Sequence, residues 1–216
     1  MSGFSNSPKL LKGGIVLIDS VTSSVRRIIA LQYNPDSISR TLQVQGVGAE
    51  SGDRSEALRL KGPPVETVKV EAEMDATDQL EEKNGVTTEV GLHPQLATLE
   101  LIVYPTSSQL QTNNSLAQSG TLEIAPMETP LMLFIWSKQR IVPVRLTEFS
   151  ITEEAFDATL NPIRAKVSLG MRVLSVNDIG FNHKGGSLFM SYLQNKEQLG
   201  QKSLGGDFSA LGITGI

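Results

Sequence analysis

The sequence contains no cysteine, only two histidines and few aromatic side chains among its 216 residues. Without cysteine, neither a disulfide nor a thiolate metal site can form. His93 and His183 lie far apart in separate predicted connections, so we expect no convergent metal site or histidine base. The acidic pairs at 81–82 and 153–154 would point to opposite faces of a strand rather than share a site. We therefore expect no catalytic residue, no metal, no cofactor and a protein that is not an enzyme.

Long hydrophobic runs are also absent. The longest, at residues 130–136, suits one buried strand and falls well short of the roughly 18–20 residues of a membrane helix. Residues 1–14 lack the apolar segment of a signal peptide. The formal net charge of −4 favours neither nucleic acid nor an anionic membrane surface. We expect a protein that folds in the cytoplasm, has no nucleic-acid partner and does not insert into a membrane.

Alternation of apolar and polar residues dominates what is present. It is clearest at 65–75, where Val68, Val70 and Ala72 alternate with charged residues, as in an antiparallel sheet with one solvated face. The apolar phase slips between Leu146 and Phe149, which predicts a bulge, and Pro143 places that strand near an edge or a bulge. Further strands are expected at 13–19, 25–33, 38–45, 131–137, 141–151 and 163–176.

Helical spacing appears in two places. Leu96, Leu99 and Val103, with Pro94 near the start, predict a helix at about 93–104. A second helix is expected at about 187–202, with Ser187 as its N-cap. The uncharged polar stretch 106–120 is interpreted as a loop. These patterns predict a mainly β, α+β fold in a single domain, residues 1–203, followed by a Gly-rich tail, residues 204–216.

Four segments together resemble one protein family. Residues 29–45, "IALQYNPDSISRTLQVQ", resemble the opening of tube-like adaptor proteins of contractile injection systems. Residues 91–105, "GLHPQLATLELIVYP", look like the central helix of that family, which ends in Tyr-Pro. Residues 160–178 and 185–199 are similar to its last strand and C-terminal helix. The segments occur in the family's order over about residues 25–200.

The resemblance implies a tail-tube-like antiparallel β-barrel or sandwich with flanking helices. Six copies would form a ring that joins the trimeric, VgrG-like spike to the inner tube and initiates the tube. Its partners would be itself, the spike, an inner-tube or tube-initiator protein and other baseplate proteins of a phage tail-like particle assembled in the bacterial cytoplasm. Asn34-Pro35 would be the corner between one strand and a long ribbon. Many family members carry a LysM module, which has no counterpart after residue 204, so we expect no cell-wall binding.

Two alternatives to the adaptor role stay open. One is an inner-tube or tube-initiator paralogue of the same particle. The other is a stand-alone β-sandwich that binds a ligand, against which the only tryptophan, Trp136, is predicted to lie in the core. The residues expected at protein interfaces are Arg54, Arg59 and Lys61 in the polar connection 46–64, and Phe208, Leu211 and Ile213 in the tail.

Overall fold

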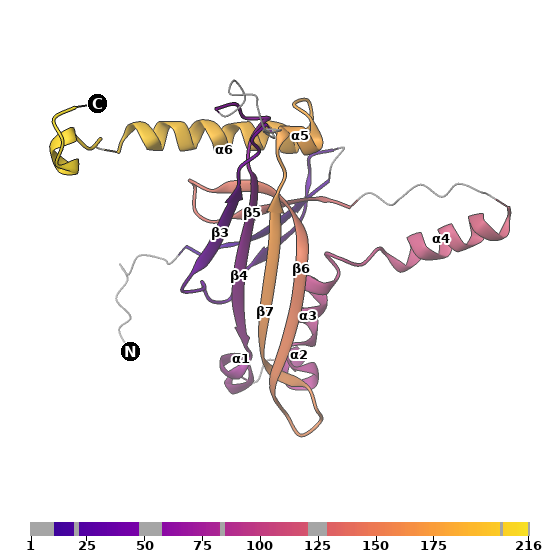
Figure 1. Ribbon diagram of the computed structural model, residues 1–216. Helices are drawn as coiled ribbons and strands as arrows, with labels where there is room; N and C mark the ends of the chain where they lie inside the picture. The colour runs from indigo at the N-terminus through magenta and orange to yellow at the C-terminus, as the bar shows by residue number, and fades with distance from the viewer. Residues whose placement is uncertain are drawn as a thin grey trace.

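Seven antiparallel strands form one sheet in the computed structural model, which describes residues 11–19, 22–47, 58–82, 85–120, 129–203 and 205–215 (Figure 1). The order across the sheet is β2-β1-β5-β6-β7-β4-β3. The strands are β1 Gly14–Ile18, β2 Val25–Ala30, β3 Ile38–Gln43, β4 Val65–Asp75, β5 Leu131–Ile135, β6 Ile141–Phe156 and β7 Pro162–Val173. The mainly β, α+β fold class is confirmed.

The alternating strands bury the side chains that the sequence predicted. Val68, Val70 and Ala72 of β4 are buried, and so are Ala165 and Val167 of the neighbouring β7. Their core extends over β1, β5 and β6 and is covered by helices. Burial of these apolar side chains, at about 25 cal/mol per Å², is the main favourable term that holds the sheet against the helices.

The phase slip in β6 is a bulge, as predicted. Pairing between β6 and β7 shifts between Leu146 and Glu148. Of the two positions that Pro143 indicated, the bulge applies and the edge does not, because β6 lies between β5 and β7 and its bulge follows shortly after Pro143. The Pro143 carbonyl accepts a hydrogen bond from the backbone of Leu174, one residue beyond the end of β7. The N–H and the carbonyl of a strand residue face the same neighbouring strand, so the missing N–H of Pro143 faces the end of the β6–β7 ladder. A central strand can accommodate a proline at that position.

The described residues contain six α-helices and one short 3-10 helix. They are α1 Thr77–Glu81, α2 Gly85–Val90, α3 His93–Glu100, α4 Ser107–Gln118, α5 Val176–Ile179, α6 Lys184–Gln201 and the 3-10 helix η1 Phe208–Leu211. The two predicted helices correspond to α3 and α6, although α3 ends at Glu100. His183, rather than Ser187, caps α6, with its Nδ1 accepting from the Gly185 backbone at 3.0 Å.

The loop predicted at 106–120 is wrong, because this stretch forms the helix α4. Thr106 and Gln109 form a reciprocal capping box at its start. The Thr106 hydroxyl accepts from the Gln109 backbone, and the Gln109 side chain accepts from the Thr106 backbone. This pair satisfies helical N–H groups that would otherwise depend on water.

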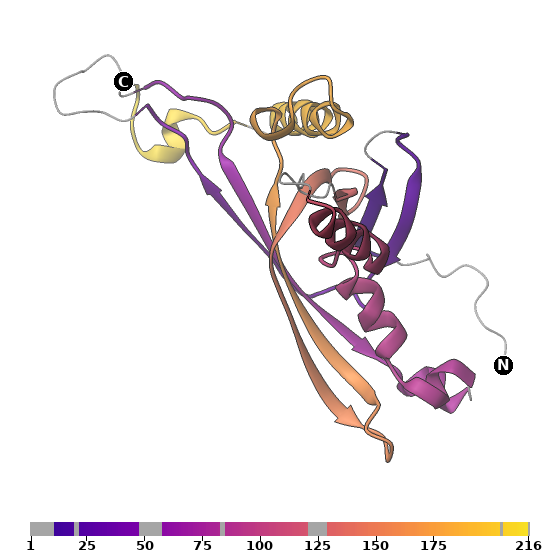
Figure 2. The same cartoon turned by 90° about the vertical axis from the view of Figure 1, so that its right-hand side faces the viewer.

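The sheet is open rather than closed into a barrel, so that part of the expectation is wrong: in the described chain β2 and β3 are edge strands that do not pair with each other. It is nevertheless curled. In a flat sheet the edge strands β2 and β3 would lie about 29 Å apart. The connection between them, residues 31–37, could span about 28 Å only if it were fully extended, but it contains bends. The two edges must therefore lie closer together than in a flat sheet. Figure 2 shows the long strands on one side, the β1–β2 hairpin on the other and α3 between them.

Asn34-Pro35 lies in this crossing between the two edges. The Asn34 side chain holds the N-terminal strand, accepting from the Gly13 backbone at 2.9 Å and donating to the Leu11 carbonyl at 2.7 Å. Gln32 bonds both the N–H and the carbonyl of Asp75 at the end of β4. The corner therefore ties β1, β2 and β4 together as the chain changes edges.

Candidate assembly surfaces

One face of the long strands is polar throughout. Neighbouring outward side chains pair across strands, with 2.9 Å between Lys69 and Glu148 and 2.9 Å between Arg164 and Asp75. Such exposed pairs contribute little to stability, about 0–1 kcal/mol each. Cations and anions occur in nearly equal number on this polar face: Lys69, Arg164, Lys166 and Arg172 against Glu71, Glu73, Asp75, Glu148 and Glu154.

The corner at 33–37 overhangs this polar face and forms a hollow of about 600 Å³ with β3, β4 and β7. Asp36, Glu71 and Glu73 line it together with Lys69. Among the described residues, no three histidine or carboxylate side chains gather in a way that could hold a metal ion.

The β3–β4 ribbon extends beyond the core, and the described residues of its outer part, 42–47 and 58–61 (the ribbon tip), expose apolar side chains. Leu42, Val44, Leu58 and Leu60 are exposed there. An isolated bridge between Gly46 and Leu60 keeps the two arms together. Arg59 and Lys61 lie on this tip, both exposed, and their backbones pair with Val47 and Gln45. The structure therefore places these two predicted interface residues at a projecting end, while Arg54 lies outside the described residues.

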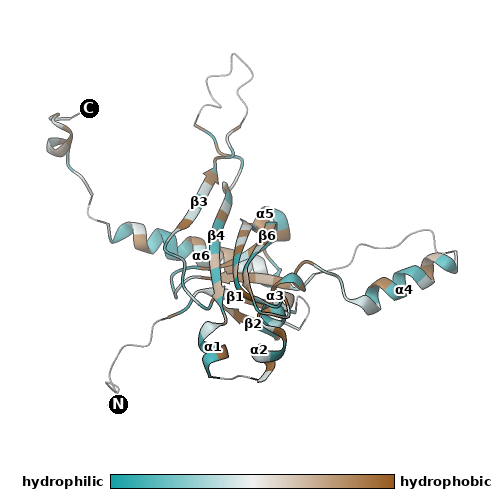
Figure 3. Ribbon diagram, turned by 90° about the horizontal axis from the view of Figure 1, so that it is seen from below, coloured by the Kyte–Doolittle hydropathy of each residue, from teal (hydrophilic) through white to brown (hydrophobic). Residues whose placement is uncertain are grey.

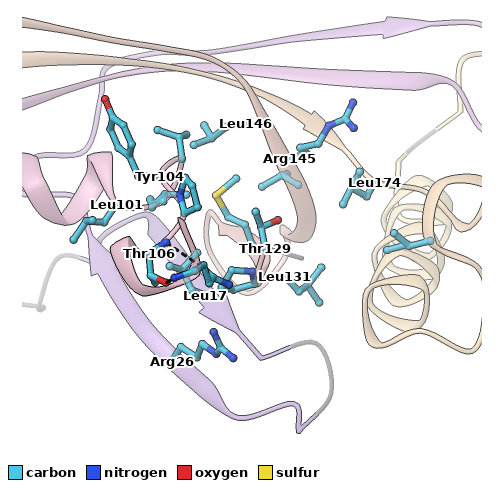
Figure 4. Close-up of a pocket in the computed structure, with 18 of the residues that line it drawn as sticks. Leu17, Arg26, Leu101, Tyr104, Thr106, Thr129, Leu131, Arg145, Leu146 and Leu174 are labelled. Atoms are coloured by element: carbon cyan, nitrogen blue, oxygen red, sulfur yellow. Dashed lines mark hydrogen bonds between the residues drawn. The ribbon is translucent and has the colours of Figure 1, made fainter. Parts of the chain in front are cut away.

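A groove of about 800 Å³ lies where α3 leads into α4. Figure 4 shows Leu101 and Tyr104 at the left, Leu146 at the top, and Leu17 and Leu131 close together below them. The described residues that line the groove include Arg26, which pairs with Asp19, and Arg145 and His183, but no carboxylate. The described lining is thus apolar with cationic side chains at its margins, and Tyr104 adds an aromatic ring.

Helix α4 projects from the body beside the groove, and none of its described residues is buried (Figures 1 and 3). It contains no charged residue, and Leu110 and Leu116 are exposed on it. An isolated helix of 12 residues is marginally stable in water. This arm is therefore expected to gain stability from packing against another molecule.

The C-terminal arm, α6 followed by η1, projects from the opposite side (Figures 1 and 3). The first half of α6 packs against the core through the buried side chains of Phe189 and Tyr192. Leu199, near the end of α6, is exposed. Beyond it, the predicted interface residues Phe208, Leu211 and Ile213 are all exposed on η1 and the residue pair that follows. The three predicted tail residues thus lie exposed within one short segment.

A buried carboxylate anchors this arm to the ribbon. Glu66 of β4 is 4% exposed. It accepts hydrogen bonds from Arg40 Nε at 2.8 Å, Lys196 Nζ at 3.0 Å and the Tyr192 hydroxyl at 3.0 Å. Burial alone would raise the pKa of Glu66, but the hydrogen bonds and charges of Lys196 and Arg40 outweigh it and lower the pKa below 4.5. Lys196 also lies 4.0 Å from the Tyr192 ring centre.

Comparison with known proteins gives little beyond this geometry. No family model matches the sequence, and no curated protein matches it. Among solved structures, it is similar to a chain of the tail of an empty GTA (gene transfer agent) particle with C6 symmetry. The identity is 14%, over 75% of this chain and 90% of that chain, with a TM-score of 0.28. A likeness this loose carries no argument about function.

Proposed function

We propose that the chain is a structural subunit of a contractile, phage tail-like particle. Six copies would form a ring between the VgrG-like spike and the inner tube, initiate the tube and assemble in the bacterial cytoplasm with other baseplate proteins. The family resemblance over residues 25–200 supplies the particular role. In this proposal the chain has no catalytic activity.

The observation that carries the proposal is the apolar surface on the projecting elements. The ribbon tip, the joint between α3 and α4, and the tail all expose large apolar side chains. Free monomers rarely expose several such clusters, which usually mark protein contacts. A subunit in a ring could cover them with its neighbours, and the open sheet edges β2 and β3 could also be covered there.

The polar face suits a wet surface in the same assembly. We place it toward the channel or toward an adjoining ring. Because its cations and anions nearly balance and many pair across strands, it presents no strong field of one sign to a passing molecule. It would resist adhesion in a channel better than an apolar or single-sign surface.

The tube-initiator or inner-tube paralogue remains an alternative with the same ring geometry. The ligand-binding module is a second candidate, favoured by the 800 Å³ groove, which lies in the size range of ligand pockets. A free binding module, however, would leave the projecting arms without partners.

The test is to express a tagged copy with its neighbouring genes, isolate it, and examine it by negative-stain microscopy and mass spectrometry. Co-purification of spike, tube and sheath proteins in a sheathed particle with six-fold rings is the expected result. A stable monomer without such partners at any concentration would refute the proposal and favour the binding module.

A further inference from the structure

The tail segment 205–215 is folded, and its hydrogen bonds to described residues all lie within the segment. The Asp207 side chain accepts from the Ala210 backbone at 2.9 Å and caps η1. Gly212, with φ of 70°, ends it, and the Ile213 backbone donates to the Phe208 carbonyl at 3.1 Å. Every described residue of this segment is exposed, and its described hydrogen bonds are all local. A preformed apolar segment loses less entropy when it binds.

The groove beside α4 is complementary to this segment. Its walls are apolar, and the tail segment presents Phe208, Leu211 and Ile213. Of its two arginine lining residues, Arg26 already pairs with Asp19, so Arg145 is the cation that a docked carboxylate would meet among the described residues. The tail segment carries a single charge, the carboxylate of Asp207. The hydrogen bonds from Ser209 and Ala210 lower the pKa of Asp207, which keeps it ionised.

The tail segment cannot easily reach the groove of its own chain. His183, at the start of α6, lines that groove, and the 18 residues of α6 carry the chain about 27 Å away. From Gln201 to Phe208 an extended chain spans at most about 25 Å. The tail and α4 also project from opposite sides of the body (Figure 3). A groove within reach therefore belongs to another copy.

We propose that the tail segment of one copy docks in the groove of the next copy, with Phe208, Leu211 and Ile213 against its apolar wall. This inference rests on the proposed ring. The contact is head-to-tail, since two different surfaces meet, and repetition of such a contact closes a ring when the rotation allows it. In this arrangement the tail segment connects neighbouring subunits within one ring.

Disulfide trapping tests this contact, because the natural chain has no cysteine to interfere. Leu211 and Tyr104 are 73% and 65% exposed, so L211C and Y104C should fold normally. The double variant, oxidised after assembly, should give a ladder of covalent multimers on a non-reducing gel. A mixture of the two single variants should stop at the dimer. The matched control pairs L211C with E71C on the polar face and should give no ladder.

Ring formation is measured in parallel by native mass spectrometry of the reduced protein. Rings without a ladder above the control would overturn the tail contact and leave the proposed function intact. A disulfide within single chains would also overturn it, since the tail would then reach its own groove. If no rings form, the proposed function fails, and the tail contact fails with it.

Discussion

Replacing Glu66 with glutamine should loosen the junction between the ribbon and α6. The substitution keeps the shape of the side chain but removes the charge that Arg40, Lys196 and Tyr192 hydrogen-bond. Hydrogen bonds to charged groups contribute about 1.5–3 kcal/mol each. The Arg40 and Lys196 side chains are 26% and 35% exposed, so water can partly solvate them after the change. We therefore expect E66Q to lower the free energy of unfolding by about 2–3 kcal/mol near neutral pH.

The effect should depend on pH in a defined direction. The folded pKa of Glu66 is lowered from 4.5, so its charge stabilises the fold fully above pH 4.5. That stabilisation is lost as pH falls through the folded pKa, because protonation then favours the unfolded chain. The difference between wild type and E66Q should shrink below pH 4.5. Other carboxylates affect both proteins equally and cancel in the comparison.

Urea unfolding followed by the fluorescence of Trp136 and by circular dichroism measures this difference. The matched control is E148Q, which removes the surface pair with Lys69, where the side chains are 67% and 62% exposed. It should change the unfolding free energy by at most about 1 kcal/mol. An E66Q protein within about 0.5 kcal/mol of wild type, or a difference that grows in acid, would refute the reasoning.

Three further outcomes are expected. G186A should destabilise the fold by about 1–3 kcal/mol in urea unfolding, because the added Cβ would overlap the Gly180 carbonyl. G200A on the same helix adds a Cβ that has no neighbouring atom within 4 Å, and it should stabilise the fold by up to about 1 kcal/mol. Equal effects of the two substitutions would contradict the packing of α6. The pKa of Asp157, lowered to about 2 chiefly by the Asn161 backbone and side chain, should be measurable by NMR titration, and a value near 4 would mean that the β6–β7 turn is open in solution. Deleting 204–216 should leave the melting temperature unchanged while weakening assembly in native mass spectrometry; an unfolded domain would instead place the tail in its own core.

The strands and the bulge could be predicted because they depend on local alternation. The phase slip after Leu146 locates the bulge to within two residues. What failed depends on contacts that lie far apart in sequence. Pro143 indicated either an edge or a bulge, and the edge is excluded only by the pairing of β6 with both β5 and β7. The barrel failed because closure requires β2 and β3 to pair, which the strand pattern does not specify.

Two features of the candidate surfaces were missed although the sequence contains a signal for them. Thr106 and Gln109 form the capping-box spacing that marks a helix start, yet the uncharged stretch that follows was interpreted as a loop. Arg40 interrupts the apolar alternation of its strand, and Glu66 lies buried at the start of the next one. Two charges of opposite sign on paired strands indicate a buried ion pair. The groove has no such signal, because its walls come from segments that lie far apart in the sequence.

The strand order also determines when the sheet can form during synthesis. β1 pairs with β2 on one side and with β5 on the other. The pair between Gly14 and Ile135 can therefore form only after residue 135 has been synthesised. At about 5–20 residues per second, this takes roughly 6 to 24 s after the first strand is made. During this time the β1–β2 hairpin exposes an unpaired edge and its apolar side chains. Nascent chains of this protein should therefore depend on chaperones more than a local helical fold of equal length would.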